Sequence, residues 1–231
     1  ILKINFSGKN MSIEQSVVNI IRSILPDRLF KYIPRIYYNL NKTRYKFFQR
    51  PLLQKETFKA KKRRDKEGFF ELYCKGKGVD IGYGGDLLSP NCFGWDIEDG
   101  DAHYLEKISN EEFNFLYSSH LLEHLDDVNV TIKNWWRVIK KNGYMILYLP
   151  ERDLYEKKKT LPSRFSLDHK HFFKLENDEK PNTIGIMQLL ERNLKNYKVI
   201  YSKICKEGFT ITDPYKHSDG EYSIEIIVQK L

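Results

Sequence analysis

The stretch "VDIGYGGD", residues 79–86, places three glycines directly after a short apolar run. The apolar run predicts a strand over residues 77–81, and the glycines then form the turn at its carboxyl end. The turn lacks the Lys-Ser/Thr pair of a phosphate-binding P-loop and the spacing of the dinucleotide fingerprint G-x-G-x-x-G. Asp80 and Asp86 stand at its two ends, and two carboxylates repel a pyrophosphate but attract a cation. The loop therefore favours a cationic ligand over a phosphate.

A second group of acids lies in "GWDIEDGDA", residues 94–102. Asp96 stands where α/β folds place an acid that accepts hydrogen bonds from both hydroxyls of a ribose. Asp101, beside Ala102, is near enough to meet an adenine amino group, and Asp80 could meet the amino group at the other end of such a ligand. A cation that joins an adenosine to an amino acid is S-adenosylmethionine, and glycines let the backbone approach it closely. These residues predict S-adenosylmethionine as the cofactor.

Apolar runs and polar segments alternate after residue 75, and this order predicts the fold class. Such alternation is typical of an α/β protein with a mostly parallel sheet and helices on both faces. Ligands of these sheets bind over the carboxyl ends of the strands. The strands are expected at residues 77–81, 92–97, 113–119, 144–150, 197–204 and 222–230, and the helices at residues 127–141 and 183–194.

Four motifs carry a resemblance to class I S-adenosylmethionine-dependent methyltransferases. "VDIGYGGD" matches the first family motif and "GWDIEDGDA" matches the acid of the second strand with the adenine contact. "FNFLYSSHLLEHLDD" resembles the fourth strand with its loop, and "WWRVIKKNGYMILYLPE" resembles the next helix and strand. The resemblance covers about residues 75–151 and implies a Rossmann-like sheet and a transferase activity. It implies cofactor contacts at Asp80, Gly82, Tyr83, Gly84, Asp96, Ile97, Asp101, Ala102, Ser119 and His120.

Two departures from the family pattern bear on the structure. Only ten residues separate Gly85 from Asp96, so the helix that the family places between the first two strands is expected to shrink to a turn around "LLSPN". The usual Pro-Gly-Gly before the next strand is replaced by Lys141-Asn142-Gly143. Asn and Gly both tolerate the left-handed turn conformation, so this change is harmless.

The methyl acceptor is suggested by a narrower resemblance. The segment "RRDKEGFFELYCKGKGVDIGYGGD" and the segment "LPERDLYEKKKTLPSRFSLDHKHFF" are similar to those of methyltransferases encoded among surface-polysaccharide genes. This resemblance implies polysaccharide biosynthesis and O-methylation of a sugar hydroxyl of a nucleotide sugar or glycan.

Removal of a proton from a hydroxyl acceptor calls for a base, and histidines supply the candidates. His120 and His124 in "SSHLLEH" follow a predicted strand, and a helix beginning there would place both on one face. A packing role for His124 and a backbone hydrogen bond for Glu123 are the alternative. A metal site is a further alternative, because H-x-x-E-H resembles the E-x-x-E-H cluster of some metal-assisted O-methyltransferases. The zincin pattern H-E-x-x-H does not occur, and we expect no metal.

The segment "PSRFSLDHKHFF", residues 162–173, predicts a loop, and loops at strand ends often carry specificity. Asp168 could orient His169 as a general base. Arg164 could hold a phosphate or carboxylate of the acceptor, and His171 is a second candidate substrate-binding residue. A surface loop with a helix cap is the alternative.

The positive charge belongs to the N-terminal part of the chain. Residues 1–72 carry 17 Lys and Arg against 6 Asp and Glu, whereas residues 73–231 carry 22 against 25. We expect residues 1–72 to form a basic, aromatic helical extension and residues 73–231 to form the methyltransferase domain. The extension either covers the domain with a solvated basic face or contacts a polyanion or an anionic membrane.

The bulk sequence limits the remaining possibilities. Three widely spaced cysteines form neither a disulfide framework nor a zinc motif, which favours a reducing, cytoplasmic location. No apolar run approaches the roughly 20 residues of a membrane span. A methyltransferase acting on RNA or another polyanion, and an inactive binding module of the same fold, remain as alternative functions.

Overall fold

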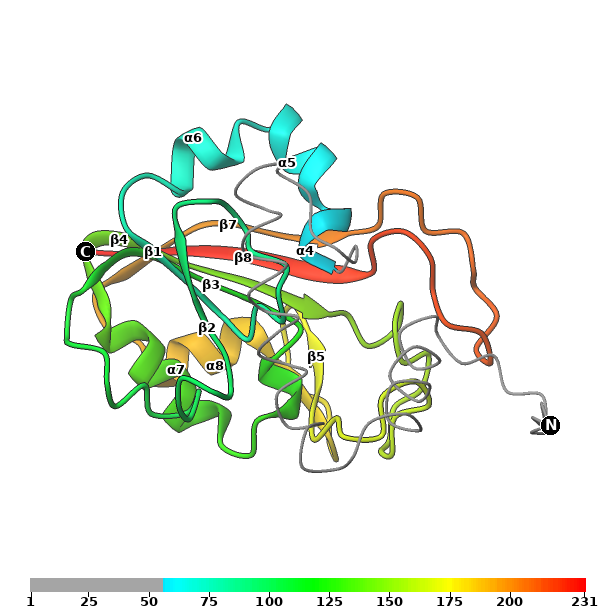
Figure 1. Ribbon diagram of the computed structural model, residues 1–231. Helices are drawn as coiled ribbons and strands as arrows, with labels where there is room; N and C mark the ends of the chain where they lie inside the picture. Colours follow the sequence, from blue (N-terminus) through cyan, green and yellow to red (C-terminus); the bar gives the residue numbers. More distant parts are fainter. Residues whose placement is uncertain (1–55) are drawn as a thin grey trace, which may run out of the picture. The chain divides into compact units, whose positions relative to one another are not determined.

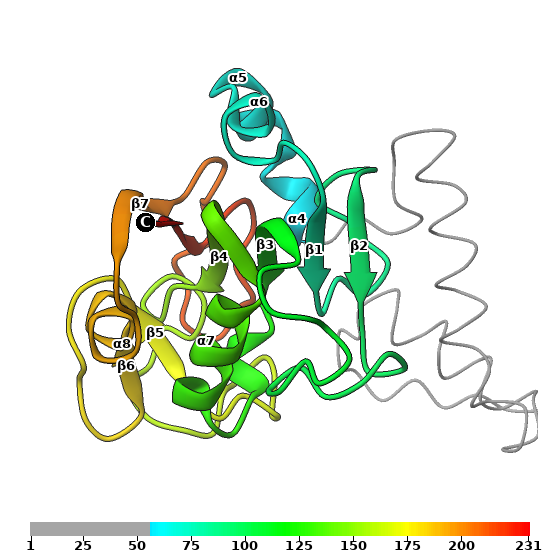
Figure 2. The ribbon, with the colours of Figure 1, turned by 90° about the vertical axis from the view of Figure 1, so that its left-hand side faces the viewer.

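A computed structural model describes residues 56–231, and a six-stranded sheet is its centre (Figure 1). The strand order is β2-β1-β3-β4-β8-β7, with β2 and β7 at opposite edges (Figure 2). A two-stranded sheet of β5 and β6 accompanies it. The strands are β1 (Gly78–Ile81), β2 (Cys92–Trp95), β3 (Phe113–Ser119), β4 (Ile139–Pro150), β5 (Phe172–Lys174), β6 (Thr183–Gly185), β7 (Tyr197–Cys205) and β8 (Ser223–Lys230).

The strand directions confirm a mostly parallel α/β sheet. β2, β1, β3 and β4 run parallel to one another, whereas β8 lies antiparallel to both β4 and β7. All six strands expected from the apolar runs are present in this sheet. The carboxyl ends of the four parallel strands therefore meet at one side, where ligands of such sheets bind.

Helices α7 (Val128–Arg137) and α8 (Ile186–Asn193) cover one face of the sheet (Figure 1). Their apolar side chains, such as Trp135 and Leu189, join one buried cluster with side chains of the parallel strands. Asp127 caps the first of these helices because its Oδ1 accepts the backbone N–H of Asn129 and Val130 at 3.0 Å. The apolar cluster is the core that holds the strand ends in place.

Both of these helices are shorter than the sequence pattern predicted. The helix expected at residues 127–141 ends at Arg137, because Ile139 already pairs with Phe113 of β3. The helix expected at residues 183–194 begins at Ile186, because Thr183–Gly185 pairs with β5. Strand pairing with distant segments overrides the helical periodicity at both places.

Three short helices cover the other face of the sheet: α4 (Glu56–Lys59), α5 (Lys61–Lys66) and α6 (Phe69–Tyr73). The contact is polar and buried. The Arg64 side chain is 0% exposed, and its Nη2 lies 2.6 Å from Oε2 of Glu225 on β8. Arg63 binds both Glu221 and Glu225 at 2.9 Å. Ion pairs thus fix the helical segment just before the first strand to the sheet.

No helix separates β1 from β2 in the structure, as the short spacing predicted. The ten residues form turns, and Leu87 and Leu88 bury their side chains below them. The three cysteines are free and buried. Within residues 56–231, no helix has the length and apolar character needed to cross a membrane. Residues 1–55 of the predicted basic helical extension lie outside the described residues.

Candidate active site

A cavity of about 750 Å³ lies at the carboxyl ends of β1, β2 and β3. This volume suits a ligand of nucleoside size. Six of the residues predicted to hold the cofactor are in its wall, namely Gly82, Asp96, Ile97, Asp101, Ala102 and His120. The wall is completed by Trp95, Gly100, His103, Leu121, His124, Leu125 and Asp168.

A smaller pocket of about 150 Å³ adjoins the large cavity. Both are lined by Gly82 and His120, so these two residues mark where they meet. The other residues of the small pocket are Glu56, Thr57, Tyr83, Gly84, Asp86 and Ser119. The two spaces together bring nine of the ten predicted cofactor residues to one place.

The glycine loop is held to the end of β2 by its own backbone. The N–H of Gly82 donates to the carbonyl of Trp95 at 2.8 Å, and the N–H of Gly84 donates to Oδ2 of Asp96 at 2.9 Å. Gly82 has φ +69°, and a Cβ built on it would lie 2.7 Å from the Leu121 side chain. Glycine is therefore required at this position both for its conformation and for space.

Two acids that follow β2, Asp96 and Asp101, line the large cavity together with the apolar Ile97. Oδ1 of Asp96 accepts the N–H of Ile97, and Oδ1 of Asp101 accepts the N–H of His103 at 2.7 Å. The Ile97 side chain is 85% exposed although it lies in the cavity wall. An exposed isoleucine beside two fixed acids offers a surface for a flat apolar ring with polar edges.

Asp80 occupies a different place from the other predicted cofactor residues. It is fully buried, and its Oδ2 accepts the N–H of Leu88 at 2.7 Å. Burial raises the pKa of Asp80 well above its usual value. Asp80 lines neither space, so it supports the loop from below.

The charged side chains in the walls of the two spaces are all acids, and one of them, Glu56, is paired with Lys59 at 2.7 Å. Asp96, Asp101 and Asp168 line the large cavity, and Glu56 and Asp86 line the small pocket. Among the described residues, neither wall contains a lysine or an arginine. A cation is favoured here over a phosphate, as the two acids of the loop predicted.

His120 follows β3 in an unusual backbone conformation. Its φ is +49°, and its backbone N–H donates to the Tyr148 carbonyl at 2.9 Å. The Nε2 atom lies 2.8 Å from Oγ of Ser223 on β8. Burial lowers the pKa of His120 to about 4, so its imidazole is neutral at pH 7. A neutral ring at the meeting point of the two spaces can accept a proton.

The predicted helix through His120 and His124 is replaced by a single 3₁₀ turn, η1 (Leu122–His124). The turn nevertheless directs His120, Glu123 and His124 toward one another. Glu123 is fully buried, and burial raises its pKa to about 7. The carboxylate lies behind the two histidines that line the cavity.

The loop of residues 162–173 brings two of its predicted residues to the same cluster. Nδ1 of His124 lies 2.9 Å from Oδ2 of Asp168, and the ring of His169 packs edge-on against the ring of His124. Burial alone would lower the pKa of His169, but Nδ1 is bonded to Oε1 of Glu156 at 2.6 Å and the pKa is raised. Asp168 thus contacts His124, whereas Glu156 holds His169.

Arg164 and His171 lie apart from both spaces. Arg164 donates to the Pro214 carbonyl at 2.8 Å and its guanidinium stacks on Tyr215. Nε2 of His171 lies 3.3 Å from the Asp126 carbonyl. Neither residue is in a cavity wall, so a substrate-binding role for them remains a prediction.

Three residues of this region were missed by the sequence reasoning: Glu56, Glu156 and Ser223. Glu56 and Ser223 come from opposite ends of the described chain, and no spacing signal links them to the motifs. Glu156 stands in the charged run "ERDLYEKKK", which favours a solvated surface rather than burial. Only the folded chain shows their position.

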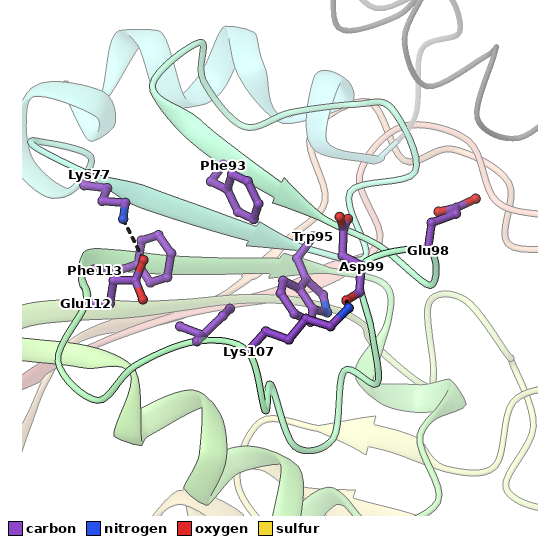
Figure 3. A pocket seen from close by; sticks show the side chains of 9 residues that line it. Lys77, Phe93, Trp95, Glu98, Asp99, Lys107, Glu112 and Phe113 are labelled. Carbon is purple, nitrogen blue, oxygen red and sulfur yellow. Dashed lines mark hydrogen bonds and ion pairs between the residues drawn. The ribbon is translucent and has the colours of Figure 1, made fainter.

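A third cavity, of about 350 Å³, lies beside β2 and is separate from the predicted site (Figure 3). Phe93 and Phe113 form its apolar wall, and Lys77 is paired with Glu112 across 2.6 Å. It shares only Trp95 with the large cavity. None of the predicted site residues contributes to it.

The sequence is similar to known proteins in one part of the chain. Residues 79–147 match the model of the family described as "Methyltransferase domain". No curated protein matches the chain.

Solved structures with a related fold include an S-adenosylmethionine-dependent methyltransferase from Archaeoglobus fulgidus. It is 18% identical, with 84% of this chain and 100% of that chain covered and a TM-score of 0.48. An S-adenosylmethionine-dependent methyltransferase from Thermotoga maritima is 16% identical, with 95% and 100% covered and a TM-score of 0.43. Such values are too low to assign an activity, whereas the family match covers the glycine loop, the acids after β2 and the turn after β3. Residues 79–147 therefore match a methyltransferase domain, and S-adenosylmethionine is the cofactor.

Proposed function

We propose that this protein transfers a methyl group from S-adenosylmethionine to a hydroxyl of a sugar, in a nucleotide sugar or a glycan. The observation that carries the proposal is the charge of the site. The walls of the two adjoining spaces contain five carboxylates and, among the described residues, no lysine or arginine. This lining suits a cationic cofactor and an uncharged part of an acceptor.

The residues present fit the cofactor at both ends. Asp96 and Asp101 would hold the ribose and the adenine, with Ile97 against the ring. Glu56 and Asp86 in the small pocket would hold the ammonium group, because both are acids next to the glycine turn. Gly82 lines both spaces, and a Cβ there would lie 2.7 Å from the Leu121 side chain. With these contacts the reactive sulfonium would lie near His120.

The cofactor supplies an electrophilic methyl group on a sulfonium. In the overall reaction the S–CH₃ bond breaks with its electron pair passing to sulfur, an O–CH₃ bond forms, and the acceptor hydroxyl loses its proton. The protein aligns the two reactants and provides a base. His120 is our candidate for the base, since it is neutral at pH 7 and lines both spaces.

The acceptor class is supported by the polar groups opposite the glycine loop. His124 and Asp168 line the same cavity and can bond hydroxyl groups. A phosphate would find no positive side chain there among the described residues, so the phosphates of a nucleotide sugar would lie outside the cavity. The resemblance to methyltransferases of surface-polysaccharide genes favours the same class.

Label transfer tests this proposal. The protein is incubated with methyl-labelled S-adenosylmethionine and, in separate reactions, with nucleotide sugars, glycan extracts or RNA. We expect label in a sugar fraction as a base-stable ether, and loss of turnover without loss of cofactor binding in His120→Asn. Label in RNA, or an ester or amine product, would contradict the proposal. No transfer together with no cofactor binding would favour an inactive module of the same fold.

The basic N-terminal segment has a proposed role of its own. Residues 1–72 would contact an anionic membrane or another polyanion, since positive charge is concentrated there. Vesicle sedimentation with and without anionic lipid, using the full chain, tests this, and equal binding to both vesicle types would contradict it.

A further inference from the structure

We propose that Glu123, His124 and His169 bind a divalent transition-metal ion at the wall of the large cavity. The carboxylate and imidazole atoms that these three residues offer lie within 4.8 Å of one another. The proposal concerns a site that is distinct from the cofactor contacts.

The geometry centres on one carboxylate oxygen. Oε1 of Glu123 lies 3.8 Å from Nε2 of His124 and 3.9 Å from Nε2 of His169. Nδ1 of His120 lies 3.8 Å from the same oxygen. These separations are too long for hydrogen bonds. They are close to the spacing of about 3.4 Å between ligands of a tetrahedral ion with bonds of about 2.1 Å.

The carboxylate of Glu123 has no other partner among the described residues. Both of its oxygens are buried without a hydrogen bond, and the side chain is 0% exposed. A buried carboxylate without a partner is unfavourable, and such groups in proteins are normally paired or bound to a metal. An ion between the carboxylate and the imidazoles would satisfy it.

Carboxylates lie next to Nδ1 of both histidines, as they often do in metal-binding histidines. Nδ1 of His124 faces Asp168 at 2.9 Å, and Nδ1 of His169 is bonded to Glu156 at 2.6 Å. In both rings this contact leaves Nε2 directed toward Glu123. Such carboxylate–histidine pairs fix the ring and strengthen the free nitrogen as a ligand. The hydrogen bond is formed at His169, whereas Nδ1 of His124 lies close to Asp168 without a hydrogen bond.

The ligand types select a class of metal. Imidazole nitrogens with one carboxylate suit Zn²⁺, Mn²⁺, Fe²⁺ or Co²⁺, whereas Mg²⁺ and Ca²⁺ prefer sites made of oxygen atoms. No cysteine belongs to the cluster, since Cys74, Cys92 and Cys205 lie elsewhere in the described part of the chain.

The position suggests what the ion does, and this part rests on the proposed function. His120 and His124 both line the large cavity, so an ion held by the cluster would reach an acceptor oxygen there. A bound ion lowers the pKa of a coordinated hydroxyl. The hydroxyl would then lose its proton before its oxygen attacks the methyl carbon, with His120 or water accepting that proton.

Binding of Co²⁺ to the full chain tests the site. The visible absorption of bound Co²⁺ reports coordination by nitrogen atoms, whereas Zn²⁺ has no visible absorption. After treatment with a chelator, the protein is titrated with Co²⁺ alone. We expect one ion per chain, and at least tenfold weaker binding in Glu123→Gln and His169→Gln. His171→Gln is the matched control, since it lies two residues from His169 and outside the cluster. It should bind Co²⁺ as the wild type does.

Two results would overturn the inference: no saturable Co²⁺ binding by the wild type, or equal binding by the wild type and both cluster variants. If the buried substitutions prevent folding, Asp168→Asn decides, because this side chain is 74% exposed. Loss of its support to His124 should weaken Co²⁺ binding about tenfold or more, and unchanged affinity would contradict the site.

Cofactor binding is measured separately. A chain that binds S-adenosylmethionine but no metal refutes only this inference, and one that binds metal but no cofactor refutes only the proposed function.

Discussion

The replacement Glu225→Gln is predicted to release the α4–α6 segment from the sheet. Glu225 is fully buried on β8 and accepts from Nη1 of Arg63 at 2.9 Å and from Nε of Arg64 at 2.7 Å. The Tyr201 hydroxyl donates to the same carboxylate. A glutamine offers one acceptor in place of two and turns its N–H₂ toward these donors. The Arg64 charge would then be buried without its counter-ion.

The size of the effect follows from this burial. Breaking a buried ion pair by removing one partner costs about 3–5 kcal/mol. The aromatic faces around Arg64 offset a small part, since its guanidinium lies 4.8 to 5.0 Å from the ring centres of Phe69, Tyr117 and Tyr148. In a chain of this length the loss corresponds to a lower melting temperature by roughly 6–20 °C.

The lowered pKa of Glu225 makes the free energy of unfolding depend on pH. Burial alone would raise the pKa of Glu225, but the charges of Arg64 and Arg63 hold it at about 2, below the usual value of 4.5. Because the pKa is lowered in the folded state, the stabilisation is complete well above pH 4.5 and is lost as the pH falls toward 2. At pH 3.5 it should be about 1 kcal/mol smaller than at pH 7.

Urea unfolding of the wild type and of two variants at pH 7 and pH 3.5 measures both effects. Asp65→Asn is the matched control, because it breaks the exposed pair of Lys61 and Asp65 in the same segment. Exposed pairs contribute only about 0–1 kcal/mol. Equal free energies of unfolding for Glu225→Gln and Asp65→Asn at pH 7 would refute the reasoning.

Two further predictions concern the cofactor cavity. Gly82→Ala should lose about 1–2 kcal/mol of stability and weaken S-adenosylmethionine binding at least tenfold, because its φ is +69° and its Cβ would lie 2.7 Å from Leu121. Gly208→Ala, at φ +74° but away from the site, should show the stability loss alone, and calorimetry with thermal unfolding separates the two. Ile97→Ser should leave stability within about 0.5 kcal/mol of the wild type but weaken cofactor binding roughly fivefold, because the 85% exposed side chain loses a contact that only the ligand makes. Leu72→Ser, at a 56% exposed position on α6, should change neither quantity, and unchanged affinity in Ile97→Ser would contradict the assigned place of the adenine.

The sheet was predictable because each strand is a short apolar run between polar segments. Residues such as Val79 and Leu147 are buried whatever the details of packing, so the pattern in the sequence identifies their strands. The helix ends were less predictable. Helix α7 ends at Arg137 because Ile139 pairs with a strand more than twenty positions earlier in the chain. A local sequence pattern does not indicate pairing with a distant strand.

The site was predictable where its residues belong to short motifs that follow the strands. Gly82, Asp96 and Asp101 follow strands directly, and parallel strands bring their carboxyl ends together. The cluster around Glu123 was only partly predictable. His120, Glu123 and His124 are close in sequence, whereas Glu156 joins them through a loop whose path depends on tertiary packing.

The buried side chains before the first strand could not be predicted from the sequence. The run "KKRRDK" predicts a solvated basic face, yet Arg63 and Arg64 are buried against Glu221 and Glu225. The signal would have been Glu225 in the last strand, where acids are rare, together with Glu221 just before that strand. Their partners lie about 160 positions earlier in the sequence.

Calorimetric titration of three proteins shows whether the acidic cavity behind the glycine loop holds S-adenosylmethionine. We predict one binding site in the wild type and about 10- to 100-fold weaker binding in Asp96→Asn, since a hydrogen bond to a charged group contributes about 1.5–3 kcal/mol. Glu98→Gln removes the same charge two residues away, at an exposed position outside this cavity, and should bind as the wild type does. No heat of binding in the wild type, or equal affinities for Asp96→Asn and Glu98→Gln, would contradict the account.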